Sequence, residues 1–182
     1  VTKGNKAYYE GCKIIDYPAF RVRGFMQDVG RTFMSLEELK REIALLSQYK
    51  INVFHWHLTE NQGWRLQSLR YPKLNAPSSY ERMPAQYYTL QEAKELVTFC
   101  KKHNVLLIPE IDMPGHSRAF EKAFGVAMQS EKGIAILKEL LDEVVDNFDI
   151  PYIHIGTDEV VFSNPQFVPE MVAYLRNKGK KV

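Results

Sequence analysis

The sequence predicts an α/β fold, a (β/α)8 TIM barrel of which this chain carries about the first four βα units. Apolar runs typical of buried strands alternate with helical stripes, and this alternation indicates a parallel sheet. Polar residues follow each predicted strand, at the end where a barrel places its active site. An open doubly wound sheet is the competing architecture, but the first strand is not followed by a glycine-rich phosphate loop.

The first two units each pair a strand with a helix. Strands are predicted at residues 20–29 and 51–58. Ser35 and Glu38 have the spacing of a capping box, which marks the start of a helix. That helix has an apolar stripe made of Leu36, Leu39, Ile43 and Leu46. Residues 59–88 form a long connection, and connections of such length in a compact domain are usually functional.

The remaining units continue the pattern. Thr89 and Glu92 form a second capping box, and a strand follows at 105–111. The next helix is indicated by the stripe of Ile134, Leu137, Leu141, Val144 and Phe148, and the next strand lies at 152–156. A last helix is predicted to begin near Pro169, where proline is tolerated, and to end at Gly179. Residues 180–182 then begin a fifth strand.

These units divide the chain into two parts. Residues 1–19 are a lead-in segment, and residues 20–182 are interpreted as the N-terminal half of a catalytic barrel, because a barrel needs eight units. The first four residues contain neither an initiator Met nor the apolar region of a signal peptide. We therefore expect a processed or excised piece.

Composition excludes several classes of protein. With 45% hydrophobic and 25% charged residues, the chain is ordinary globular material. A net charge of +2 without a run of Lys or Arg gives no reason to expect a nucleic-acid partner. No apolar stretch approaches the roughly 18–20 residues that cross a membrane. Cys12 and Cys100 match neither a disulfide framework nor a zinc spacing.

The adjacent acids Asp158 and Glu159 are the most informative feature. They follow a short apolar run, 151–155, that is typical of a buried strand. One ionised carboxylate raises the pKa of its neighbour, which suits a site with one protonated acid and one charged acid. A solvated acidic turn is the alternative for an isolated pair, and the other motifs of the chain argue against it.

Five segments of the chain resemble family 20 glycoside hydrolases, the β-N-acetylhexosaminidases, and they occur in that family's order. They are residues 23–31, 50–59, 62–65, 109–116 and 154–160. The resemblance covers most of this chain but only the N-terminal half of the family's barrel. It implies an enzyme that acts on terminal N-acetylglucosaminide or N-acetylgalactosaminide residues of glycans, without a cofactor. An extracytoplasmic location is implied by the resemblance alone.

The resemblance also implies a retaining mechanism without a protein nucleophile. In that mechanism the substrate's own 2-acetamido oxygen attacks the anomeric carbon and forms an oxazolinium intermediate. Glu159 matches the general acid that protonates the leaving oxygen and later the base that activates water. Asp158 matches the residue that orients the acetamido group and stabilises its developing positive charge.

Four further residues receive roles by the same resemblance. Arg23 is expected to bind hydroxyls of the terminal sugar, with a salt bridge beneath the barrel as the alternative. His116 is expected to support Glu159 in a hydrogen-bond chain with an acid after the second strand. That acid is Glu60, where many family members have Asp, so its reach differs. Asp112 is expected to orient His116 or a neighbouring loop, or to be purely structural. Thr157 stands where Gly is usual.

Two other functions remain as alternatives. His55 and His57 share one face of the second strand and, with Asp158 or His154, could hold zinc in an amidohydrolase-type barrel. Because both lie inside the predicted strand, we prefer histidines bonded to polar neighbours and predict no metal site. The second alternative is a non-catalytic carbohydrate-binding or structural module, with Trp64 as a candidate stacking ring. The acid pair favours the enzyme.

The last expectation concerns the 182 residues by themselves. A half barrel leaves strand edges unpaired and one apolar sheet face uncovered, and both invite association. We therefore expect this chain alone to lack glycosidase activity, and either to pair with another copy or to behave as a loosely packed species.

Overall fold

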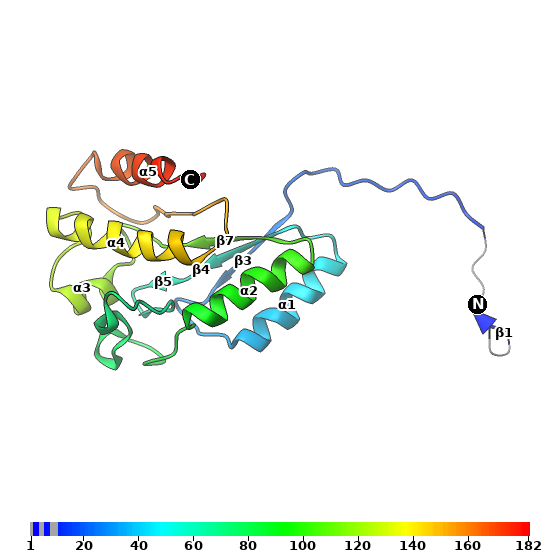
Figure 1. The fold of residues 1–182 in the computed structure, drawn as a ribbon, viewed down its shortest axis with the longest axis horizontal. Helices are drawn as coiled ribbons and strands as arrows, with labels where there is room; N and C mark the ends of the chain where they lie inside the picture. Colours follow the sequence, from blue (N-terminus) through cyan, green and yellow to red (C-terminus); the bar gives the residue numbers. More distant parts are fainter. Residues whose placement is uncertain (1, 4–5, 8–10) are drawn as a thin grey trace.

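A computed structural model describes residues 2–3, 6–7 and 11–182 of the chain. Its centre is a parallel sheet with the strand order β3, β4, β7, at Gly24–Asp28, Val53–His57 and Leu106–Glu110. In-register pairing places Asp28 beside His57, and His57 beside Glu110. The carboxyl ends of the three strands therefore lie level, which brings their last residues together. Figure 1 shows the three strands side by side.

The sheet continues beyond β7 through single bridges instead of full strands. Glu110 pairs with His154, and Tyr152 pairs with Lys181, both in parallel. The strands predicted at 152–156 and 180–182 thus occupy the next two sheet positions in chain order. Sequential parallel strands that each follow a helix are the arrangement of a (β/α)8 barrel, and the described sheet is part of one.

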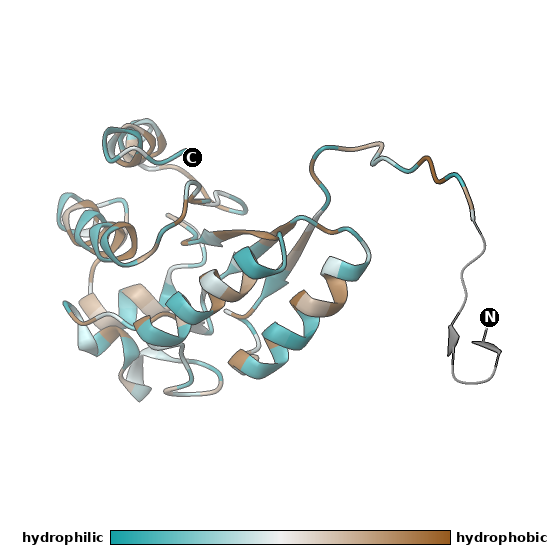
Figure 2. Cartoon of the chain, turned by 45° about the vertical axis from the view of Figure 1, so that its right-hand side comes forward, coloured by the Kyte–Doolittle hydropathy of each residue, from teal (hydrophilic) through white to brown (hydrophobic). Residues whose placement is uncertain are grey.

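Both predicted capping boxes are confirmed. Ser35 and Glu38 cap α1 (Leu36–Gln48) reciprocally, and Thr89 and Glu92 cap α2 (Leu90–Lys102) in the same way. Each box satisfies backbone N–H groups that have no partner inside the helix. Leu39 and Ile43 of α1 are fully buried. The helices are striped in hydrophilic and hydrophobic colours in Figure 2, as expected for helices that cover a sheet with one side.

The later helices agree with the predicted stripes except at one place. They are α4 at Glu131–Asn147 and α5 at Phe167–Asn177, with the predicted Pro169 in the first turn of α5. The sequence analysis missed α3 (Arg118–Phe124), a seven-residue helix whose N-terminal residue makes no side-chain capping bond. A helix this short has neither a full apolar stripe nor a start signal.

The long connection after β4 is ordered by one buried arginine. It contains β5 (Thr59–Glu60), β6 (Gly63–Trp64) and two short 3₁₀ helices, η1 (Pro72–Asn75) and η2 (Pro77–Ser79). The buried guanidinium of Arg65 donates hydrogen bonds to five backbone carbonyls, those of Val29, Gly30, Arg82, Met83 and Gln86. Trp64 is 3% exposed, so it cannot stack on a sugar as the binding-module alternative required.

The first part of the chain is separate from this core. Strands β1 (Thr2–Lys3) and β2 (Lys6–Ala7) pair in antiparallel, and residues 1, 4–5 and 8–10 of the predicted lead-in segment lie outside the described residues. Residues 11–22 extend away from the sheet (Figure 1). The first strand begins at Gly24, later than the predicted 20, because Phe20 and Val22 are exposed and unpacked. Among the described residues, no helix is long and apolar enough to cross a bilayer.

Candidate active site

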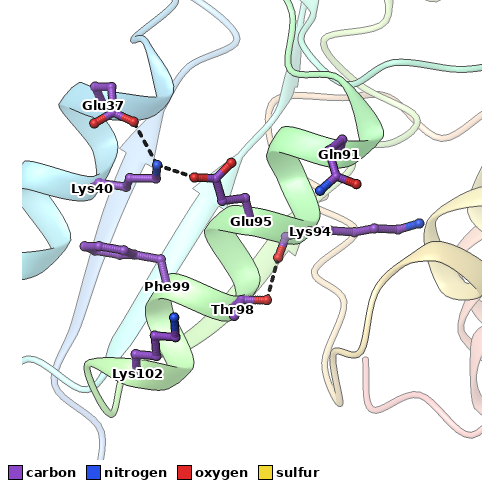
Figure 3. Close-up of a pocket in the computed structure, with 8 residues that line it drawn as sticks. All are labelled: Glu37, Lys40, Gln91, Lys94, Glu95, Thr98, Phe99 and Lys102. Carbon is purple, nitrogen blue, oxygen red and sulfur yellow. Dashed lines mark hydrogen bonds and ion pairs between the residues drawn. The ribbon is translucent and has the colours of Figure 1, made fainter.

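Two cavities differ in their location and in the side chains that line them. The larger, about 590 Å³, lies on the outer side of α1 and α2 (Figure 3). Its central Lys40 is already paired with Glu37 and Glu95. The smaller, about 280 Å³, lies at the carboxyl ends of the sheet strands, and its lining includes Arg31, His116 and Asp158. The second cavity is the candidate site, because in parallel α/β folds ligands bind at that end of the strands.

A chain of hydrogen bonds joins a buried acid to an exposed one. His116 Nδ1 lies 2.6 Å from Oδ2 of the buried Asp112, and His116 Nε2 lies 3.2 Å from Oε2 of Glu159. The backbone N–H of Asp112 donates to Thr59 Oγ1 at 2.9 Å, which fixes the inner end of the chain. The imidazole is therefore held between two carboxylates and can carry a proton beside Glu159.

The surrounding charges determine the protonation of His116. Burial lowers the pKa of His116, but the hydrogen bond to Asp112 and the charge of Glu60 outweigh burial and raise it above its ordinary value. Burial also raises the pKa of Asp112, against the hydrogen bond from His116. We therefore assign the positive charge to the imidazole of His116, because the several carboxylates around the ring, Asp112 among them, stabilise that charge.

Glycines allow the loop that carries the acids to approach this chain closely. A Cβ at Gly156, where φ is +91°, would collide with the carboxylate of Asp112. A Cβ at Gly115 would lie 2.9 Å from the backbone oxygen of Asp158. His116 and Glu159 themselves have positive φ, 45° and 48°. Non-glycine residues in this region cost about 1–3 kcal/mol and cluster at functional sites.

Both adjacent acids lie near His116, and Asp158 also lines the cavity. Asp158 Oδ1 lies 3.6 Å from His116 Nδ1, whereas Glu159 contacts the other ring nitrogen, Nε2. The side chains of Asp158 and Glu159 are 70% and 75% exposed. Both carboxylates are thus available to a ligand, and each contacts His116.

Glu60 has a different main partner from the one predicted. Its Oε1 lies 2.6 Å from a guanidinium nitrogen of Arg31 and 3.4 Å from His116 Nδ1, whereas Asp112 makes the short bond to His116. Burial raises the pKa of Glu60, against the hydrogen bond that it accepts from the N–H of Asn61. Glu60 therefore acts on His116 by charge and anchors Arg31.

Arg23 does not lie at the carboxyl end of a strand, which is the location that its predicted sugar contact assumed. Arg23 precedes β3, at the amino end of the sheet, and its guanidinium donates to the backbone carbonyls of Lys50 and Phe20. Arg31 lies three residues after β3 and lines the cavity, where it is paired with Asp28 and Glu60. The physical reason is direction, since the site lies at the carboxyl ends of the parallel strands and Arg23 stands at the amino end of β3.

A second cluster surrounds Glu110, the last residue of β7. Oε2 of this buried carboxylate lies 2.6 Å from His55 Nε2 and 2.7 Å from His57 Nδ1, and Oε1 lies 3.2 Å from His154 Nδ1. The expectation of histidines bonded to polar neighbours is thus confirmed, although His57 ends β4 instead of lying inside it. Burial opposes ionisation of Glu110, but the three imidazoles hold its pKa well below the usual range.

From the sequence, Arg31 and His154 received no role in binding the sugar, and Glu110 was not predicted as a member of the site. Arg31 is one of the polar residues that follow a predicted strand, and that position is its signal. Glu110 carries no such signal, because its partners are remote in sequence and it stands within an apolar run.

Comparisons with known proteins agree with this geometry. The model of the family described as glycosyl hydrolase family 20, catalytic domain, matches residues 20–132, more than half of the chain. A β-hexosaminidase of Porphyromonas gingivalis is 37% identical over 175 residues, which cover 82% of this chain and 22% of the relative.

Solved structures of the same family superpose on the chain. The β-N-acetylhexosaminidase of Bacteroides fragilis has a TM-score of 0.81 at 32% identity and covers 91% of this chain and 41% of its own. The exo-β-N-acetylglucosaminidase of Vibrio harveyi, solved with N-acetylglucosamine, has a TM-score of 0.78 at 29% identity and covers 92% of this chain and 36% of its own. The chain therefore spans well under half the length of these relatives.

Proposed function

Because the chain belongs to glycosyl hydrolase family 20, we propose that its residues 20–182 form the N-terminal half of the catalytic barrel of a β-N-acetylhexosaminidase. The substrates are glycans that end in N-acetylglucosamine or N-acetylgalactosamine. The observation that carries the proposal is the chain Asp112–His116–Glu159 beside Asp158, at the carboxyl end of a parallel sheet.

The proposed reaction retains the configuration of the sugar and is assisted by the substrate. The 2-acetamido oxygen bonds to the anomeric carbon while the bond to the leaving oxygen breaks, and Glu159 gives its proton to that oxygen. Water then attacks the anomeric carbon of the oxazolinium ion, gives a proton to Glu159 and releases the sugar. Each proton that Glu159 loses is thus regained, as general acid–base catalysis requires.

His116 supports this exchange from behind Glu159. An imidazolium 3.2 Å away stabilises the carboxylate form of Glu159 after it has donated its proton. The buried Asp112 keeps the ring oriented through the 2.6 Å bond to Nδ1. A positioned donor of this kind requires little reorganisation during the reaction, which is the main source of electrostatic catalysis.

Asp158 and Arg31 hold the two sides of the sugar in this proposal. Asp158 accepts the N–H of the acetamido group and balances the positive charge of the oxazolinium ion. Arg31 is 48% exposed at its side chain and lines the cavity, so its free N–H groups can donate to paired sugar hydroxyls. This assigns to Arg31 the sugar contact that the sequence analysis had placed at Arg23.

The test uses a polypeptide that carries this chain together with the rest of the barrel. Release of the chromophore from a chromogenic N-acetylglucosaminide should require Glu159 and Asp158. His103→Gln is the matched control, since His103 lies at the C-terminal end of α2, away from the cavity. Full activity of Glu159→Gln, or no activity of the unmodified protein on either N-acetylhexosaminide, would contradict the proposal.

A further inference from the structure

The cluster around Glu110 contains three groups of the kind that bind a transition metal. His55 Nε2, a Glu110 carboxylate oxygen and His154 Nδ1 all lie within 4.8 Å of one another. They come from neighbouring parallel segments, since Glu110 pairs with His154 in the sheet and lies beside His57 of β4. Sheet pairing therefore fixes where the three side chains start, before any ion is bound.

The contact between His154 and Glu110 is electrostatically incomplete. His154 Nδ1 accepts the backbone N–H of Gly156 at 3.2 Å, so its lone pair faces outward from the ring. The same nitrogen lies 3.2 Å from Glu110 Oε1, which also presents a lone pair. When His154 is protonated, Nδ1 donates to Oε1 instead, and this contact raises the pKa of His154. When His154 is neutral, both atoms are acceptors, and a metal ion between them would also be within reach of His55.

The spacing of these atoms matches metal coordination. Two ligands about 2.1 Å from one zinc ion, at angles between a right angle and a tetrahedral one, lie roughly 3.0–3.4 Å apart. The 3.2 Å between His154 Nδ1 and Glu110 Oε1 is within this range. His55 is closer to the carboxylate, at 2.6 Å, and an ion would replace the hydrogen bond that joins them.

The donors and the location decide the class of ion. Two imidazoles and one carboxylate favour Zn²⁺, Co²⁺ or Ni²⁺ over Mg²⁺ and Ca²⁺, which prefer oxygen ligands. All three residues line the cavity of the candidate active site, which gives an ion a path from solvent. His57 remains bonded to the other side of the carboxylate and keeps it in place, as partners of metal ligands commonly do.

We propose that His55, Glu110 and His154 form a binding site for one divalent transition-metal ion, of the Zn²⁺ type, in the floor of the cavity. The competing cluster of Asp112, His116 and Asp158 is the less suitable one, because it has a single imidazole and that ring is shared with Glu159. The site follows from the geometry of the ligands and does not depend on the proposed reaction.

The test measures binding and uses no catalysis. The chain without an affinity tag, carrying Cys12→Ser to remove an exposed thiol, is dialysed against Zn²⁺ at mildly alkaline pH. Visible absorption of the Co²⁺ form reports the ligand field. One equivalent should bind, and His154→Ala and His55→Ala should each weaken binding at least about tenfold. His103→Ala, outside the cluster, should bind as the background chain does.

Variants are compared only after circular dichroism shows an unchanged fold. His154 is half exposed, so its truncation is the variant least able to disturb packing. The absence of saturable Zn²⁺ binding by the background chain would overturn the proposal. So would unchanged affinity in both His154→Ala and His55→Ala, and so would loss of binding in His116→Ala alone, which would place the ion at the other cluster.

Discussion

His116 Nε2 lies 3.2 Å from Oε2 of Glu159, although the two residues are 43 positions apart in the sequence. The contact connects an exposed acid to a buried one, because the other nitrogen of the same ring is bonded to Asp112. A carboxyl group that must lose and regain a proton is stabilised in its ionised form by a neighbouring charge that is already held in place.

Replacing Glu159 by Gln should affect substrates according to their leaving groups. In a polypeptide with the complete barrel, the loss should be about 10² to 10⁴ in kcat/KM where the departing oxygen is basic, because that oxygen needs a proton. It should be much smaller for an activated aryl leaving group. The measurement is kcat/KM over a series of aryl N-acetylglucosaminides. Equal losses across the series would reject the acid role.

Asp158→Asn should reduce turnover without unfolding the protein. The amide cannot balance the positive charge of an oxazolinium ion, whereas the exposed side chain contributes little to packing. A thiazoline that imitates this intermediate should inhibit the unmodified protein strongly and the variant weakly. Thermal unfolding serves as the control for folding. Trapping of a covalent sugar ester on Asp158 or Glu159 would instead indicate a protein nucleophile.

Substitutions of Arg31 and Arg23 should differ in their effect on kcat/KM. Hydrogen bonds to a charged group are worth about 1.5–3 kcal/mol, so Arg31→Gln should lower kcat/KM roughly 10- to 150-fold. Arg23→Gln should leave kcat/KM nearly unchanged, since its guanidinium bonds backbone carbonyls at the other end of β3. Steady-state kinetics of both variants on one chromogenic substrate is the measurement. The opposite order would restore the original assignment of the sugar contact to Arg23.

Local signals predicted much of the fold. Ser35 and Thr89 begin helices where the capping boxes indicated, because such boxes depend on residues three positions apart. The location of each strand's carboxyl end was enough to indicate the acids and His116. Local signals could not indicate strand length, and for this reason the first strand was predicted to begin at residue 20, whereas it begins at Gly24, directly after Arg23.

The missing parts of the site depend on contacts between remote segments. Glu110 stands in an apolar run, and its partners His55 and His57 precede it by more than fifty residues. The bond between Asp112 and His116 spans only four residues, yet its dominance over Glu60 depends on how β5 and β7 pack. The spacing of residues along one sequence does not give the distances between remote segments, whereas the folded sheet does.

The protonation of His116 should contribute to stability in a direction set by its pKa. That pKa is raised above 6.5 in the folded chain, so the folded state binds the proton more tightly than the unfolded state. The stabilisation is fully present below the unfolded pKa, near 6.5, and is lost as pH rises through the folded pKa. His116→Gln should therefore cost most at mildly acidic pH and progressively less at alkaline pH.

Two measurements check this direction. Nuclear magnetic resonance of the imidazole carbons gives the pKa of His116, assigned as the signal that is missing in His116→Gln. Urea unfolding of both proteins across the pH range gives the difference in free energy of unfolding. A pKa below 6.5, or a difference that grows as pH rises, would show that burial outweighs the carboxylates around the ring.

The 182 residues alone should lack hexosaminidase turnover and should self-associate. Within the described residues, β3 pairs with β4 on one side only, and open strand edges recruit other chains. Met26 of β3 is 49% exposed beside the cavity, and Ile14, Ile15 and Tyr17 are exposed in the extended segment, which adds apolar surface that favours association. The acids also stand largely in water, where preorganised charges act weakly.

Light scattering tests the expected self-association, and a chromogenic N-acetylglucosaminide tests the expected lack of turnover. A monodisperse monomer with cooperative unfolding and measurable turnover would show that four units suffice for the fold and the chemistry.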